Sequence, residues 1–161
     1  MRIRQIIRGA GLAAATVTAL AVTTAPASAA AANWKEIQPN ANWECGSTIS
    51  HATYPGVKFQ GCVVANNSGD AQLVLVVNNQ GPKAVNIGGW TSSQFGSNVT
   101  CADSVLNPGF QRGCFGPTVS VPCNISYANS VHLTVNGSTK IATAPTLTKF
   151  CGRAGAAPSA T

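Results

Sequence analysis

The chain has 161 residues, of which 45% are hydrophobic, 9% are charged and six are cysteine, a composition that excludes a disordered, highly charged tail protein. The length suits one ordinary domain and not two. The formal net charge is +6, but Arg2, Arg4 and Arg8 lie in a segment that we expect to be removed, and the remaining cations are too scattered to form the concentrated basic surface that nucleic acids need.

The first 29 residues predict an export signal. Met1–Arg8 is positively charged, Gly9–Val22 is apolar, and Ala27-Ser28-Ala29 has the small-x-small pattern that a signal peptidase accepts. The apolar stretch is shorter than the roughly 20 residues of a membrane-spanning helix. We therefore expect a cleaved signal peptide (1–29), a secreted extracellular protein and no membrane contact after cleavage.

The segment that follows, residues 30–42, is small and polar, and predicts a flexible N-terminal arm. From Trp43 onward the pattern is β. The continuous run Leu73–Val77 predicts a strand that is covered on both faces, and Gly88-Gly89 predicts a bulge, a bend or the close approach of another backbone. In chain order, the expected strands are 43–45, 57–65, 73–77, 83–90, 98–105, 110–115 as the return of 98–105, 118–121, 131–135, 138–143 and 147–151.

The clearest hairpin surrounds Asn136-Gly137, a pair that suits a two-residue turn with positive φ at both positions. A strict two-residue turn pairs Leu133 with Lys140, which mixes apolar and polar residues on one face, so the register stays open. No segment has helical periodicity. We expect one all-β domain (43–151) built as a two-sheet, immunoglobulin-like sandwich, with a small β-barrel as the alternative, and a disordered tail (152–161).

The six cysteines predict three disulfides in an exported protein. Six cysteines allow fifteen connectivities; we expect sequential pairing, because each bridge would then staple one local strand pair. No Cys-x-x-Cys is present, and neither His51 nor His132 stands near a second ligand at metal spacing, so we expect no metal and no cofactor. The disulfide pairs that we expect are Cys45 with Cys62, Cys101 with Cys114, and Cys123 with Cys151.

Catalytic residues are scarce. Glycoside hydrolysis needs two facing carboxylates. Glu36 lies in the arm and Asp70 in a turn, which leaves Glu44 and Asp103, and nothing in the sequence indicates that these two come together. Neither histidine lies in a serine-hydrolase motif. We therefore predict that the chain is not an enzyme.

The remaining candidates are binding surfaces. Trp34, with Lys35 and Ile37 beside it, lies outside the cysteine-framed region and is the better contact candidate, whereas we interpret Trp43 and Trp90 as core residues, the alternative being a sugar-stacking platform. Arg112, in the loop between Cys101 and Cys114, has the position of a basic residue in a protease-inhibitor loop. Its alternative is an arginine that lies over the sheet.

Several motifs together resemble small secreted β proteins of Streptomyces and related actinobacteria: Trp43-x-Cys45, Cys62-Val63-Val64, the run from Leu106 to Cys114 and the Ala-rich export signal. The adaptor subunit of umbrella toxin particles is similar in layout. The resemblance implies that residues 33–42 bind a lectin-bearing partner.

The leading hypothesis is a secreted, non-enzymatic protein-binding or adaptor module that acts through its N-terminal arm or its loops on another secreted or surface protein. The alternatives are a hydrolase inhibitor that uses the Cys101–Cys114 loop, and a carbohydrate- or cell-wall-binding module whose partner is a glycan.

Overall fold

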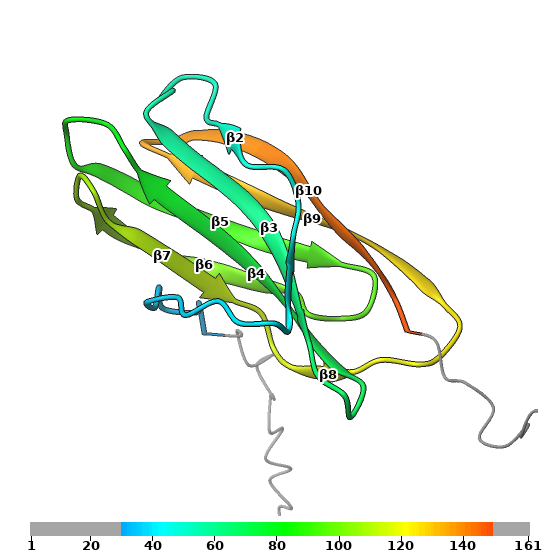
Figure 1. Ribbon diagram of the computed structural model, residues 1–161. Coiled ribbons are helices and arrows are strands. Elements are labelled where there is room, and N and C mark those ends of the chain that lie inside the picture. Colours follow the sequence, from blue (N-terminus) through cyan, green and yellow to red (C-terminus); the bar gives the residue numbers. More distant parts are fainter. Residues whose placement is uncertain (1–29, 150–161) are drawn as a thin grey trace, which may run out of the picture.

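A computed structural model describes residues 30–149, and it is a sandwich of two antiparallel β-sheets (Figure 1). The predicted all-β sandwich is confirmed, and the sheets do not close into the alternative barrel. Among the described residues, no helix is long and apolar enough to cross a membrane. The predicted signal peptide (1–29), the tail (152–161) and Cys151 lie outside the described residues.

One sheet has six strands and the other has four, and neighbouring strands are antiparallel in both. The six-stranded sheet has the order β1-β3-β4-β7, with β2 beside β3 and β8 beside β4; the four-stranded sheet has the order β10-β9-β5-β6. The strands are β1 (Trp43–Cys45), β2 (Ile49–Ser50), β3 (Val57–Ala65), β4 (Asp70–Asn79), β5 (Val85–Ser93), β6 (Val99–Leu106), β7 (Gln111–Phe115), β8 (Val119–Ser120), β9 (Ser126–Val135) and β10 (Ser138–Thr148). β2 was not predicted, and Leu147 and Thr148, which were predicted to begin a separate closing strand (147–151), are the end of β10.

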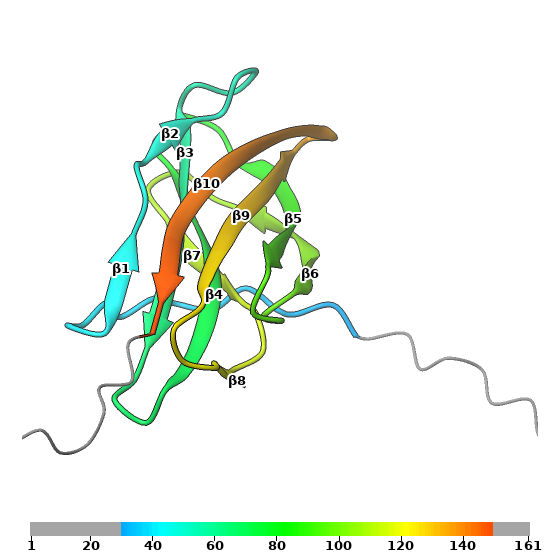
Figure 2. The same ribbon diagram turned by 90° about the vertical axis from the view of Figure 1, so that its right-hand side faces the viewer.

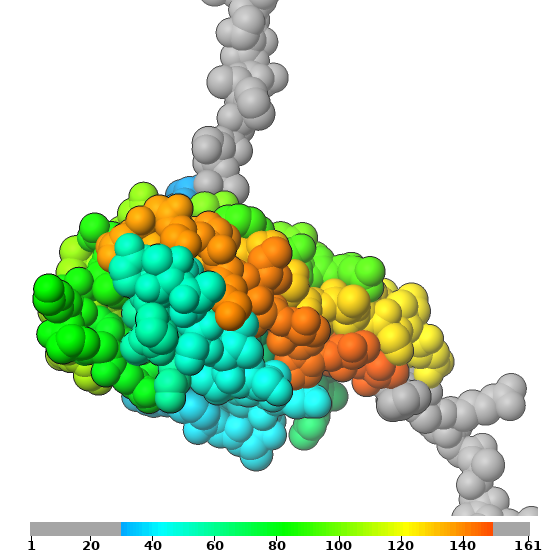
Figure 3. Space-filling model, turned by 90° about the horizontal axis from the view of Figure 1, so that it is seen from above, coloured from blue at the N-terminus to red at the C-terminus, as the bar shows by residue number. Residues whose placement is uncertain are grey.

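Strand β4 is covered on both faces, as its apolar run predicts. Leu73, Leu75 and Val77 belong to the main core between the sheets. Val74 and Val76 form a second, outer cluster with Cys62, and partly buried side chains of the arm, β1 and β7 cover it. β10, the edge strand of the four-stranded sheet away from β6, packs against β3 of the other sheet and closes the sandwich along that edge (Figures 2 and 3).

The β9–β10 hairpin has the strict two-residue turn. Asn136 and Gly137 both have positive φ, 44° and 85°, and Leu133 pairs with Lys140. The mixed face causes no conflict, because β10 is an edge strand and the Lys140 ammonium reaches past it to donate to the carbonyl oxygen of Ser50 at 3.0 Å.

The predicted hairpin between β6 and β7 is wrong, because β6 belongs to the four-stranded sheet and β7 to the six-stranded sheet. Asn79 of β4 holds the connection: its side-chain amide donates to the carbonyl of Leu106 at 2.9 Å, and its carbonyl accepts from the N–H of Gly109 at 2.7 Å. This anchor directs the chain onto β4, which pairs with β7.

Two disulfides join described residues, and both pairings are confirmed. Cys45–Cys62 staples the β1–β3 pair, as expected. Cys101–Cys114 instead links β6 to β7 and therefore joins the two sheets. Cys123 also takes part in a disulfide, and its predicted partner lies outside the described residues. Intramolecular disulfides are typical of extracellular proteins.

Candidate partner-binding surface

The N-terminal arm is docked, which differs from the flexible arm that its composition predicts. Ala32 accepts a hydrogen bond from Ala102 and donates to the carbonyl of Thr100 on β6, at 2.9 and 2.8 Å. Three residues later, Lys35 exchanges both of its backbone hydrogen bonds with Gly113 on β7, at 2.9 and 2.8 Å. The arm therefore crosses from the edge of one sheet to the edge of the other, over the gap that the Cys101–Cys114 disulfide bridges (Figure 2).

Trp34 fixes the arm between these two attachment points. Its indole Nε1–H donates to the carbonyl of Ala102 at 2.7 Å, and its half-buried ring packs against the main core. A buried indole needs a hydrogen-bond partner of this kind. The residue expected to contact a partner is thus used within the chain to hold the arm in place.

The next residues of the arm bring it to Arg112. A guanidinium nitrogen of Arg112 lies 3.9 Å from a carboxylate oxygen of Glu36, whose side chain is 80% exposed. The same guanidinium lies 5.2 Å from the ring centroid of Phe110, itself 48% exposed. Arg112 sits on strand β7 with its side chain held by these neighbours, so it does not project from a loop as an inhibitory arginine does.

A second group, of apolar side chains, lies over the outer cluster, on the other face of β7 from Arg112. Ile37 and Phe115 both press on Gly113, where an added Cβ would lie 2.5 Å from Ile37 Cγ2 and 2.9 Å from Phe115. Trp43 packs edge-on against Phe115, with ring centroids 5.9 Å apart. We call the whole surface the arm surface; its members are Lys35, Glu36, Ile37, Trp43, Phe110, Arg112 and Phe115.

The arm surface unites two candidates that the sequence kept apart. Lys35, Ile37 and Trp34 were expected to act in the arm, and Arg112 in a separate loop. The structure brings all four to the edge formed by β7 and the arm, because β7 is the strand to which the arm attaches; Ile37 lies on the outer face of the sheet there, and Arg112 on the other face. Phe110 and Phe115 were not predicted as contact residues; their position follows from the pairing of β7 with β4.

The candidate catalytic residues are not assembled. Glu44 lies on β1 of the six-stranded sheet and Asp103 on β6 of the other sheet. His51 is 1% exposed, and its ring Nε2 donates to the carbonyl of Ser138 at 3.0 Å. Burial lowers the pKa of His51 and keeps the ring neutral at neutral pH. Within residues 30–149, no group of three or more acidic, histidine or cysteine side chains is placed to hold a metal ion.

The outer face of the four-stranded sheet carries a second group of side chains, which includes a residue that we had placed in the core. Trp90, interpreted as a core residue, is 39% exposed. It stacks on His132 of the neighbouring strand β9, with centroids 4.3 Å apart and ring planes 15° apart. Ile141, 56% exposed, is the next residue across the sheet on β10. Alternation along β5 is the signal that points Trp90 outward, since Thr91 beside it is buried.

Comparison of the chain with protein-family models, with curated proteins and with solved structures gave no match.

Proposed function

We propose that the chain is a secreted, non-catalytic adaptor that binds another secreted or surface protein through the arm surface. The observation that carries the proposal is the attachment of the arm to strand β7, which brings aromatic and charged side chains together along one edge of the six-stranded sheet. An adaptor needs a rigid frame, and here the Cys101–Cys114 disulfide fixes the two sheets directly beneath the arm.

The chemistry of the arm surface is that of a protein interface. Tryptophan, phenylalanine and arginine are enriched at such interfaces, and the residues that dominate binding energy are drawn mainly from tryptophan, tyrosine and arginine. Trp43 and Phe115 supply these side chains on the outer face of the six-stranded sheet, and Phe110 and Arg112 supply them at the β7 edge, with Glu36 beside Arg112. The resemblance to adaptor subunits of umbrella toxin particles supports the same function, because it assigns partner binding to residues 33–42.

Affinity capture from the secreted fraction of the producing culture tests the proposal. The baits are the mature chain, Phe110→Ala, Arg112→Glu, and Ile141→Ser as a control on the opposite sheet, where Ile141 is also an exposed apolar residue. We expect one stoichiometric protein partner with the wild type and with the control, and at least tenfold less with the two arm-surface variants. Equal recovery with all four baits, or recovery with none, contradicts the proposal.

A further inference from the structure

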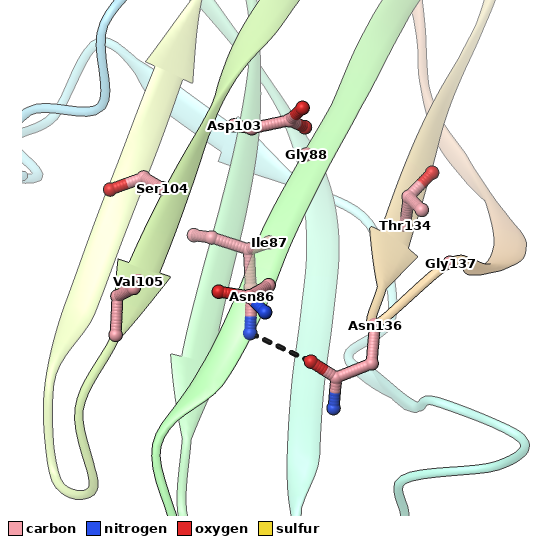
Figure 4. Close-up of a pocket in the computed structure, with 9 residues that line it drawn as sticks. All are labelled: Asn86, Ile87, Gly88, Asp103, Ser104, Val105, Thr134, Asn136 and Gly137. Carbon is pink, nitrogen blue, oxygen red and sulfur yellow. Dashed lines mark hydrogen bonds between the residues drawn. The ribbon is translucent and has the colours of Figure 1, made fainter.

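The outer face of the four-stranded sheet holds a groove. The groove has a volume of about 560 Å³ and lies over strands β5 and β6 and the β9–β10 turn (Figure 4). Its lining is mostly polar side chains and glycines. The residues used below are Asn86 and Gly88 of β5, Asp103 of β6 and Asn136 of the turn.

A β-bulge creates the floor of this groove. The pairing of β5 with β6 shifts between Ile87 and Gly89, so that Ala102 and Asp103 both lie opposite Gly88. Bulges re-aim a side chain and are common beside functional sites. The bulge directs the Asp103 carboxylate across the face of the sheet, over Gly88, where an added Cβ would lie 2.5 Å from Asp103 Oδ1 (Figure 4).

Two polar groups of the groove are available to a ligand, the Asp103 carboxylate and the Asn136 side-chain NH₂. The Asp103 carboxylate has no hydrogen-bond or ion-pair partner among residues 30–149. Asn136 uses its side-chain oxygen to accept the backbone N–H of Asn86 at 2.9 Å, which fixes the amide and leaves its NH₂ group as a donor at the rim (Figure 4). The groove therefore presents a strong acceptor and a held amide donor on one face.

An aromatic side chain stands beside the groove. Trp90 lies two residues from Gly88 along β5 and on the same face, a separation of about 7 Å along a strand. The stack with His132 orients the indole. Burial lowers the pKa of His132, so the ring beside Trp90 is neutral at neutral pH. On the opposite side, Trp90 faces the small side chain of Thr100.

We infer that this groove is a binding site for a neutral glycan, with Asp103 and Asn136 bonding to sugar hydroxyls and Trp90 contacting the apolar face of a pyranose ring. A few fixed polar groups beside an aromatic ring are the usual composition of a small-ligand site. The only charged residue that lines the groove is Asp103, which disfavours anionic glycans and nucleic acids. The site is independent of the arm surface and adds a glycan ligand to the protein partner proposed above.

Titration of the ¹⁵N-labelled mature chain with cellohexaose, chitohexaose and mannohexaose tests the inference. The three indole N–H signals separate the surfaces, since Trp34 is bonded to Ala102, Trp43 lies on the arm surface and Trp90 lies beside the groove. We expect at least one hexasaccharide to shift the Trp90 indole and the Asn136 side-chain amide and to leave the Trp34 signal in place.

Variants complete the test. Trp90→Ala and Asp103→Asn each weaken binding at least tenfold, and neither removes a buried side chain, so both fold. Phe110→Ala, an exposed aromatic on the arm surface, leaves glycan binding unchanged. The inference is overturned if none of the three hexasaccharides shifts the Trp90 indole signal, or if glycan binding survives in both groove variants.

Discussion

Removal of the Trp34 ring should release the arm and leave the sandwich folded. Trp34 is the only side chain of residues 32–35 that both packs on the core and hydrogen-bonds to β6. The arm is otherwise attached by the backbone bonds of Ala32 and Lys35. Because these attachments lie at one end of the chain, their loss opens the arm locally.

The size of the effect follows from burial. A tryptophan that is half-buried removes about 100 Å² of apolar surface from water, which is worth about 2.5 kcal/mol at about 25 cal/mol per Å². The indole hydrogen bond adds about 1 kcal/mol. Trp34→Ala should therefore weaken docking of the arm by about 3 kcal/mol, or roughly a hundredfold in its opening equilibrium.

Amide hydrogen exchange measures this opening. The N–H groups of Ala102 and Gly113 donate to carbonyls of the arm, at 2.9 and 2.8 Å, so their protection reports docking. In Trp34→Ala, both amides should exchange up to about a hundredfold faster. The amide of Val131, on β9 between two neighbouring strands, should keep its rate and serves as the control.

Two results would refute this reasoning. If Ala102 and Gly113 exchange at unprotected rates in the wild type, the arm is not docked in solution. If Trp34→Ala accelerates Val131 as much as Gly113, the indole supports the whole sandwich and not the arm alone.

Three further predictions concern the stability of the sandwich. Gly89→Ala should cost about 3 kcal/mol in the free energy of unfolding, because Gly89 has φ 149° and an added Cβ would strike the backbone of β9; a thermal melt checks this, and an unchanged Tm would contradict it. Replacing Cys101 and Cys114 by alanine should lower the free energy of unfolding by about 3 kcal/mol and speed hydrogen exchange of the Gly113 amide beneath the arm. A matched Cys45/Cys62 double variant should lower the free energy of unfolding by a similar amount and leave that amide protected. Equal exchange of the Gly113 amide in the two variants would contradict this prediction. Burial lowers the pKa of His51, so the unfolded chain binds a proton more readily than the folded one, and stability should fall as pH drops below about 6.5. Urea unfolding at pH 7.5 and pH 5 should show a smaller loss of stability between the two pH values in His51→Gln than in the wild type. An equal loss in both proteins would contradict the role of His51.

Local signals in the sequence identified most of the strands. The apolar run of β4 and the Asn136-Gly137 turn were correct because each depends on residues close in sequence. A bulge, a bend or a close approach of another backbone was predicted at Gly88-Gly89, and the structure has both the bulge and the close approach there.

The arm surface was harder to predict, because it depends on contacts between distant residues. Trp34 binds Ala102, 68 residues away, and no local pattern signals that bond. The separation of β6 and β7 into different sheets depends on Asn79, whose side chain captures a turn 27 residues later. A polar segment of small residues is predicted to be flexible from its composition alone, because the strand edges of β6 and β7 that it covers are distant in sequence.

The most direct test of the adaptor account is site-specific photo-cross-linking in the secreted fraction. A benzoylphenylalanine at Phe110 keeps an aromatic ring on the arm surface, and the same residue at Ile141 is the control on the opposite sheet. The account predicts a cross-linked protein partner from position 110 and none from position 141. A partner captured only from position 141, or from neither position, would contradict it.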